Sequence, residues 1–410
     1  MKVTFITNLY PPNQVGGYEE LCWQVASRFV ELGNEVSILT SAHGGKVASW
    51  PGQKVDQTLR LLIGKTIYDH FGGDESRRQA LVNQNIHALK DCVTSRKPDV
   101  IFCWNLFGLQ SDVLEFLGDL GIPVVMMLTD NWLASMLNPE YVGTFFRESV
   151  YGSVDEDAYL SAPSRALFDI SPNISAVFGS HYMKRFYSAS GIHFADDVVV
   201  HNGVSLEEIS LAPSLWPREA KKVDLLFASR LVEIKGAHLA VEGLSILRDE
   251  RPDINWNLEL VGDCSDKNYV EEVMRLAKTL DVLECVTLRG RVAADRLNEL
   301  FRSKDIYLFP SLYEPFSLTL IHALGAGIPT VASDIGGNTE IVSHRDTGLL
   351  FKAKDGRSLA KSVIEFVDQP SHIYEVKING ARRAKEFSAE RMVEGMLTHL
   401  KARAGLVDAQ

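Results

Sequence analysis

The stretch that decides the fold is residues 306–332, IYLFPSLYEPFSLTLIHALGAGIPTVA. It begins with the apolar run Ile306–Phe309 and ends with the apolar run Thr330–Ala332, and the residues between them suffice for one helix and two connections. Two short apolar strands joined through a helix are typical of a parallel sheet, because parallel strands need a long crossover connection. The stretch therefore predicts one strand–helix–strand unit of an α/β domain.

The same alternation of short apolar runs with helix-length amphipathic segments continues through the rest of the chain. In the C-terminal half it predicts further strands at Asp224–Ala228, Asn257–Val261 and Cys285–Leu288, and helices at Arg357–Gln369, Ile373–Phe387 and Ala389–Arg403. In the N-terminal half it predicts strands at Val3–Thr7, Glu35–Thr40, Asp99–Cys103, Pro123–Leu128, Ile174–Val177 and Val198–His201. Each half is therefore predicted to be a doubly wound α/β domain, a parallel sheet with helices on both faces.

At 410 residues the chain is too long for a single domain, since a domain typically holds about 100–200 residues. The segment Gly203–Val223 contains two prolines and no sustained period, so we interpret it as the linker. The predicted domains are residues 1–205 and 206–388, followed by a C-terminal helix, residues 389–410, that packs back toward the first domain. The irregular stretch Ala42–Thr58 is expected to be a loop at one edge of the first domain.

Composition excludes several classes of function. The formal net charge is −11, and acidic residues outnumber basic ones in the N-terminal half as well, which disfavours nucleic acid and anionic lipid as partners. The five cysteines are odd in number and widely scattered, so we expect free thiols in a reducing compartment. No signal peptide or membrane-spanning run is recognisable, and we expect a cytoplasmic protein.

Ligands of open parallel sheets bind beyond the carboxyl ends of the strands, so the loops there are the candidate site. Arg230 and Lys235 follow the predicted strand Asp224–Ala228, just before Gly236 and the next helix. Two cations in a loop that opens a helix form a natural clamp for a diphosphate.

A second candidate loop follows the strand Ile306–Phe309. Pro315 suits the first turn of a helix, so the backbone N–H groups of Phe316, Ser317 and Leu318 would be presented to an anion. Glu314 lies just before this helix and His322 eight residues on, which places them about 12 Å apart on one side of it. That span suits a ligand with a sugar at one end, a diphosphate in the middle and a ribose at the other end.

A third loop, NLYPPNQVGG at Asn8–Gly17, follows the first strand and precedes a helix with Glu19 and Glu20 in its first turn. The paired glycines Gly16 and Gly17 expose backbone N–H groups that suit a phosphate or a closely approaching substrate. A plain turn with an acidic first helical turn explains the same residues equally well.

Taken in order, these segments resemble the family-4 retaining glycosyltransferases of the GT-B fold. The resemblance spans nearly the whole chain and rests on YPPNQVGGYE, HNGV at 201–204, SRLVEIKG at 229–236, LVGDCSD at 260–266, YEPFSLTLIHALGAGIP at 313–329, SDIGGNTEIV and TGLLF. It implies two Rossmann-like domains facing a central cleft, the first binding an acceptor and the second a nucleotide sugar.

The resemblance also implies roles for single residues. Arg230 and Lys235 would neutralise the leaving diphosphate, and Glu314 would hold the donor sugar. The other implied donor-binding residues are Gly16, Gly17, Arg291, Val292, Pro315, Phe316, Ser317, Leu318 and His322. In retaining members a leaving phosphate oxygen takes the proton of the acceptor hydroxyl, so neither a protein nucleophile, a metal nor a cofactor is expected.

Two positions depart from the family pattern. His322 stands where relatives have a glutamate that binds both ribose hydroxyls, whereas an imidazole makes one hydrogen bond per nitrogen. In LTDNW at 128–132, Thr129 stands where many relatives have a histidine, and Asp130 remains as a polar candidate. We place Glu19, Thr129 and Asp130 on the acceptor or sugar side of the site.

The chain is therefore predicted to be a retaining, metal-independent glycosyltransferase, with UDP preferred over GDP and a small molecule or glycan as acceptor. The alternative is a relative without activity that binds a nucleotide sugar or a partner enzyme. The pair Asp155 and Asp157 suggests a metal-binding D-x-D, but Ser153 with Glu156 fits a capping box opening a helix. A nicotinamide-dependent dehydrogenase is disfavoured, since no G-x-G-x-x-G follows an early strand.

Overall fold

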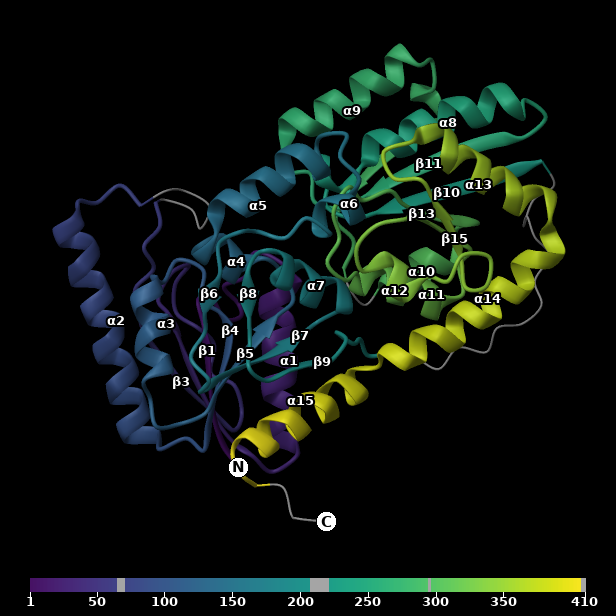
Figure 1. Ribbon diagram of the computed structural model, residues 1–410. Coiled ribbons are helices and arrows are strands. Elements are labelled where there is room, and N and C mark those ends of the chain that lie inside the picture. Colours follow the sequence, from purple (N-terminus) through teal and green to yellow (C-terminus); the bar gives the residue numbers. More distant parts are fainter. Residues whose placement is uncertain (65–70, 207–220, 294–295, 407–410) are drawn as a thin grey trace. The chain divides into compact units, whose positions relative to one another are not determined.

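The computed structural model describes residues 1–64, 71–206, 221–293 and 296–406 (Figure 1). The chain divides into two compact units. The N-terminal unit consists of Met1–Ser149, Asp157–His201 and Glu390–Gln410, and the C-terminal unit consists of Val150–Glu156 and Asn202–Ala389. Most of the expected linker, residues 207–220, lies outside the described part of the chain.

The N-terminal unit is built on a 7-stranded sheet whose strand pairs are all parallel. In spatial order its strands are β3 (Gln53–Leu59), β2 (Glu35–Ser41), β1 (Lys2–Thr7), β4 (Val100–Asn105), β5 (Val124–Leu128), β7 (Ile174–Phe178) and β9 (Asp197–Val199). Every residue of β4, β5 and β7 is buried, as expected for central strands covered on both faces. The strand order reverses between β1 and β4, so the loops after these strands are the favoured ligand site of this unit.

The helices of this unit fill the crossovers between its strands. They are α1 (Gly17–Glu31), α2 (Glu75–Arg96), α3 (Ser111–Gly118), α4 (Trp132–Leu137), α5 (Pro139–Phe145), α6 (Glu156–Leu160), which begins at the unit boundary, and α7 (His181–Ala189). A π-helical turn covers Phe146–Val150, and β6 (Phe168–Asp169) pairs with β8 (Ile192–His193). The last helix, α15 (Ala389–Arg403), contacts this unit, where His399 bonds to Ser175 and Arg403 pairs with Asp196.

The C-terminal unit is built on a 6-stranded parallel sheet. In spatial order its strands are β12 (Val286–Gly290), β11 (Asn255–Val261), β10 (Lys222–Ala228), β13 (Ile306–Phe309), β14 (Thr330–Ser333) and β15 (Leu349–Phe351). The order reverses between β10 and β13, and the two candidate loops of the sequence follow these two strands. The fold therefore brings those loops to one point at the carboxyl edge of the sheet.

Helices cover both faces of the C-terminal sheet. They are α8 (Ala237–Glu250), α9 (Lys267–Thr279), α10 (Leu297–Arg302), α11 (Leu318–Ala326), α12 (Asn338–Ile341), α13 (Gly356–Asp368) and α14 (Pro370–Ala384), with short 3₁₀ turns at Glu233–Lys235, Leu283–Cys285 and Lys385–Phe387. Figure 1 shows α8, α9 and α13 alongside β10 and β11, where they form one buried apolar cluster. The opposite face of the sheet packs against α10 and α11 in a second cluster.

The predicted pair of doubly wound α/β domains is confirmed, and a strand lies at each of the predicted positions. The expectation that Ala42–Thr58 is a loop holds for residues 42–52 and is wrong from Gln53 on, because β3 runs through Gln53–Leu59 as the edge strand of the first sheet. Its residues are mostly polar and only half-buried, so it lacks the apolar run by which the other strands are recognised. The short strand β15 (Leu349–Phe351) was not predicted from the sequence either.

All five cysteines are free thiols, as the sequence predicted. Within the part of the chain that the structure describes, no helix combines the length and the apolar character needed to cross a membrane.

Candidate active site

The site of the C-terminal unit is organised by the loop after β10. The N–H of Ser229 donates to the carbonyl of Val261 at 3.0 Å, and the N–H of Leu231 donates to the carbonyl of Asp263 at 2.9 Å. These bonds fix the loop backbone beside the end of β11. The exposed side chain of Arg230 lies between the two anchored residues, at the carboxyl edge of the sheet.

Lys235 is the last residue of the 3₁₀ turn Glu233–Lys235, which lies against the loop after β13. Gly236 ends this turn with φ +73, and a Cβ at this position would lie 1.9 Å from the carbonyl oxygen of Pro310. The N–H of Leu312 donates to the carbonyl of Ile234 at 2.8 Å. The turn therefore packs directly, backbone against backbone, on the loop that follows β13.

This packing brings Lys235 against Glu314. The ammonium nitrogen lies 2.6 Å from a carboxylate oxygen of Glu314, and the two side chains are only 15% and 10% exposed. Electrostatic interactions are strong in such a water-poor position. An ammonium has three donors, so the bond to Glu314 leaves Lys235 able to contact a ligand anion as well.

The helix that follows Glu314 begins later than the sequence suggested. α11 begins at Leu318, and the Ser317 hydroxyl accepts the N–H of Leu320 at 3.1 Å as its N-cap. The expectation that Pro315 opens this helix is wrong, because the Ser317 cap sets the start three residues further on. Pro315 and Phe316 belong to the preceding loop, and the first-turn N–H groups without an intrahelical partner are those that follow Ser317.

The loop before α11 is held by a close backbone approach. A Cβ on Gly337 would lie 2.1 Å from the carbonyl oxygen of Pro315, and the N–H of Gly337 donates to the carbonyl of Glu314 at 2.9 Å. The Phe316 ring packs edge to face on Phe387, with centroids 5.4 Å apart. Glu314 is thus fixed through its main chain and through its carboxylate.

His322 lies one turn into α11. Burial lowers the pKa of its imidazole, which keeps the ring neutral at pH 7. A neutral imidazole offers one donor and one acceptor, so it can hydrogen-bond a hydroxyl. Glu314 precedes α11, as expected, but the helix begins only at Leu318, so the helical spacing that placed Glu314 about 12 Å from His322 does not apply between them.

The base-side candidates Arg291 and Val292 follow β12. Arg291 is exposed, and Val292 packs against the second apolar cluster. The N–H of Ser265 donates to the carboxylate of Asp263 at 2.8 Å, and this bond lowers the pKa of Asp263, with smaller contributions from Arg291 and Arg230. Asp263 therefore shares the carboxyl edge with both arginines. Sequence reasoning missed it as a site residue, although LVGDCSD contained it.

In the N-terminal unit, the glycine loop ends at α1. One carboxylate oxygen of Glu19 accepts the N–H groups of Gly16 at 3.1 Å and Val15 at 3.3 Å. Gly17 is the first residue of α1, and both glycines are exposed. The structure thus brings Gly16, Gly17 and Glu19 together, but the Gly16 N–H already has an acceptor in Glu19.

Thr129 and Asp130 follow β5 in the same unit. A carboxylate oxygen of Asp130 accepts the N–H of Trp132 at 3.0 Å. Burial raises the pKa of Asp130 to about 6, against the lowering effect of that hydrogen bond, and the negative charge of Glu19 raises it further. The neighbouring Tyr18 interacts with both Thr129 and Asp130. The three residues expected on the acceptor side therefore lie close together.

The raised pKa of Asp130 predicts a pH-dependent cost in stability. Between the usual value of 3.8 and about 6, the folded protein holds a proton that the unfolded chain has released, so stability falls as pH rises through this window. Asp130→Asn removes this cost and keeps an acceptor for Trp132. We expect the variant to exceed wild type by about 1–2 kcal/mol at pH 7.5, and by much less at pH 4.5, in urea unfolding. A difference that is the same at both pH values would contradict this account.

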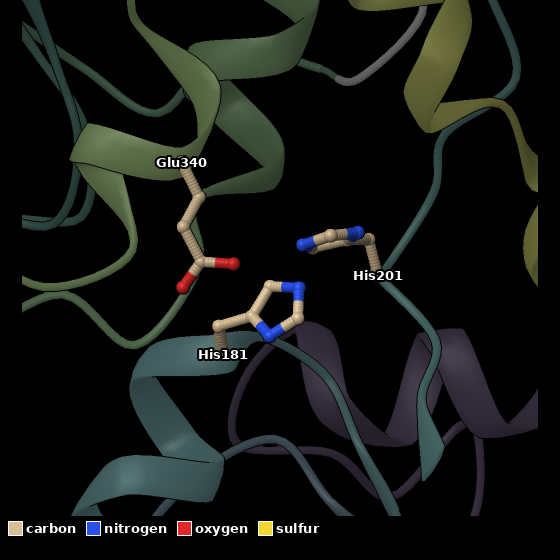
Figure 2. A group of neighbouring side chains, drawn as sticks. All are labelled: His181, His201 and Glu340. Atoms are coloured by element: carbon tan, nitrogen blue, oxygen red, sulfur yellow. The ribbon is translucent and has the colours of Figure 1, made fainter.

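Figure 2 shows two histidines of the N-terminal unit, His181 at the start of α7 and His201 after β9. Their ring centroids are 5.5 Å apart, with the rings edge to face. Glu340, also drawn, belongs to α12 of the C-terminal unit. Two imidazoles are fewer ligands than the four of a structural zinc site, and we assign no metal to this pair.

The D-x-D segment does not form the expected capping box. The helix expected after Ser153 begins only at Glu156, so the capping-box prediction is wrong. The Glu156 carboxylate instead accepts the N–H of Gly336 at 2.7 Å. An oxygen of Asp157 pairs with Arg185 at 2.6 Å, on the surface of the N-terminal unit.

Comparison with known proteins adds independent findings. Residues 215–384 match the family model described as glycosyl transferases group 1. A glycogen synthase from Mycobacterium tuberculosis is 30% identical over 389 residues, which cover 90% of this chain and 87% of that protein. A D-inositol 3-phosphate glycosyltransferase from Paenarthrobacter aurescens is 28% identical over 215 residues, so the match spans about half of each chain, 48% and 52%.

Among solved structures, the protein HepE from Anabaena, crystallised with UDP and glucose, resembles this chain with a TM-score of 0.66. The likeness covers 98% of this chain and 100% of HepE at 18% identity. At this identity the likeness concerns the fold, which the two proteins share over their full length.

Proposed function

The chain belongs to the group 1 glycosyltransferases and has the GT-B fold, and from this premise we propose that it transfers a sugar from a nucleoside diphosphate to a hydroxyl group. The observation that carries the proposal is the arrangement at the C-terminal switch point. There Lys235, which follows β10, pairs at 2.6 Å with Glu314, which follows the neighbouring strand β13. Arg230 lies in the same loop as Lys235. A diphosphate bound at these loops would meet cations from one side and helix N–H groups from the other.

The chemistry of the donor explains why such groups suffice. Breaking the bond between the sugar carbon and the phosphate oxygen develops positive charge on the sugar and negative charge on the diphosphate. Cations and helix N–H groups that are already in position stabilise that negative charge without reorganising. Glu314 can accept hydrogen bonds from sugar hydroxyls, since an ionised carboxylate is an acceptor only.

We propose that the transfer retains the anomeric configuration. A leaving phosphate oxygen takes the proton of the acceptor hydroxyl on the same face of the sugar, and the acceptor oxygen forms the new bond to the sugar carbon. No covalent intermediate on the protein is needed. Nuclear magnetic resonance of the first product formed reports its anomeric configuration, and an inverted product would contradict this step.

We further propose that the donor carries UDP and that the reaction needs no metal. Arg230, Arg291 and Lys235 supply positive charge at the carboxyl edge, the role that a divalent cation would otherwise fill. UDP is preferred because HepE, which shares the fold, binds it. Turnover that persists in excess EDTA is the expected result.

For the acceptor we propose an uncharged hydroxyl compound, a small molecule or a glycan. Glu19 and Asp130 lie close enough for the charge of one to raise the pKa of the other. Above pH 6 this acidic pair repels phosphate groups. In this respect the acceptor would differ from the inositol phosphate for which the Paenarthrobacter relative is named.

The test is a panel of UDP- and GDP-sugars incubated with the purified full-length chain. We expect slow release of free sugar from at least one UDP-sugar, together with a rise in apparent melting temperature, since a ligand that binds the native state stabilises it. A protein that binds a nucleotide sugar and never cleaves it, with any acceptor supplied, would instead be the relative without activity.

His322→Glu should leave UDP binding unchanged or tighten it by up to about tenfold, because a carboxylate can accept from both ribose hydroxyls. Isothermal titration of UDP measures this effect, with His322→Ala as the control that removes the contact. Weaker binding in the glutamate variant than in the alanine variant would show that the neutral imidazole has a role that a carboxylate cannot fill.

A further inference from the structure

A short segment of the N-terminal half of the chain belongs to the C-terminal unit. Val150–Glu156 is grouped there, although the residues on both sides of it, up to Ser149 and from Asp157 onward, fold in the other unit. Lys354, which follows β15, donates from its ammonium to the carbonyl of Gly152 at 2.9 Å. The first half of the chain thus contributes residues to the unit that carries the donor site.

Glu156 connects this segment to the turn that follows β14. One of its carboxylate oxygens accepts the N–H of Gly336 at 2.7 Å. Gly336 lies in the left-handed region, with φ +48, three residues after the end of β14. A hydrogen bond to an ionised acceptor is stronger than one between neutral groups, so it holds this turn firmly.

The held turn contacts Glu314 directly. Gly337 donates its N–H to the carbonyl of Glu314 at 2.9 Å and approaches the Pro315 carbonyl so closely that no Cβ would fit. The carboxylate of Glu314 in turn pairs with Lys235. A continuous path of hydrogen bonds and backbone contacts therefore runs from Glu156 through the Gly336–Gly337 turn to Glu314.

We propose that Glu156 is a positioning residue for the sugar end of the donor site, acting through the Gly336–Gly337 turn on Glu314. The inference rests on the proposed function for the role of Glu314. It assigns no contact with the ligand to Glu156 itself. The diphosphate and nucleoside parts of the donor would meet Arg230 and His322, which are not members of this path, so removal of Glu156 should affect the sugar and spare the nucleotide.

The experiment compares three variants of the full-length chain. Glu156→Ala removes the acceptor, and Glu156→Gln keeps an oxygen that accepts the same N–H without the charge. Asp157→Ala is the matched control, because it removes a carboxylate one residue along that pairs only at the exposed surface with Arg185, the two side chains being 73% and 51% exposed. We measure kcat and KM for the cleaved UDP-sugar, the Kd for UDP, and hydrogen exchange of the peptide containing residues 333–341.

We expect Glu156→Ala to lower kcat/KM for the UDP-sugar about tenfold or more, with the Kd for UDP within twofold of wild type. Glu156→Gln should recover most of the loss, and Asp157→Ala should match wild type. Exchange in residues 333–341 should rise in the alanine variant only. Unchanged kcat/KM and exchange in Glu156→Ala, an equal loss in Glu156→Gln, or equal losses of UDP and UDP-sugar binding would each overturn the proposal.

The exchange measurement separates this proposal from the proposed function. If the wild-type chain cleaves no nucleotide sugar, the proposed function fails, while faster exchange in Glu156→Ala alone still supports control of the turn by Glu156. If the wild-type chain is active but Glu156→Ala exchanges and reacts as wild type does, the positioning role fails and the proposed function stands.

Discussion

Lys235→Ala should lower kcat for donor cleavage by about 100- to 1,000-fold, the effect typical of removing one group that stabilises charge in the transition state. Lys235 is half-buried, whereas Arg230 and Arg291 are exposed, and it pairs with Glu314 at 2.6 Å with 15% of its side chain exposed. Its contribution is large because the leaving diphosphate gains charge where little water is present to screen it. A coupled assay that monitors the release of UDP from the donor identified by the panel measures the effect.

The same substitution also leaves Glu314 without its cation. Removing one partner of a buried ion pair costs about 3–5 kcal/mol, because the remaining charge is still desolvated. Urea unfolding should show this loss, and the double variant Lys235→Ala/Glu314→Gln should recover part of the stability while staying inactive. Lys361→Ala, on the exposed face of α13, is the control for loss of a lysine. A Lys235→Ala variant that keeps kcat within threefold of wild type would contradict the role assigned to Lys235.

The loops of the candidate site could be predicted from the sequence because the rule that places them is topological. Once the apolar runs Asp224–Ala228 and Ile306–Phe309 are recognised as strands of a parallel sheet, polar residues just after them must lie at its carboxyl edge. The strand order then places these two strands next to each other. The sequence therefore predicted that Lys235 and Glu314 both follow strands of a parallel sheet, and the observed strand order brings them to 2.6 Å.

Details set by side chains of single residues could not be predicted in the same way. Ser317 and Pro315 both suit a helix start, and in the structure Ser317 is the N-cap while Pro315 lies in the loop that packs against Gly337. Glu156 carries a suitable signature for a capping box, yet its carboxylate bonds to Gly336, which is 180 residues away in sequence. A local pattern holds no information about such a distant partner, so long-range contacts between loops were missed.

Gly236→Ala should have the second large effect, mainly on stability. Gly236 has φ +73, and a Cβ at this position would lie 1.9 Å from the carbonyl oxygen of Pro310. Because this oxygen belongs to the main chain, the backbone must shift to relieve the clash. Left-handed strain together with overpacking costs about 3–5 kcal/mol. Because the displaced turn carries Lys235, we also expect donor cleavage to fall well below wild type. Urea unfolding and the UDP-release assay measure the two effects.

Gly33→Ala separates the two causes of this loss. Gly33 follows α1 with φ +80, but a Cβ there meets no atom within 4 Å. It therefore bears the left-handed strain alone, which costs about 1–2 kcal/mol. The clash with Pro310 accounts for the remaining loss in Gly236→Ala. If both variants lost the same small amount of stability and kept full activity, the close packing of the Lys235 turn against the loop after β13 would not be what positions the cation.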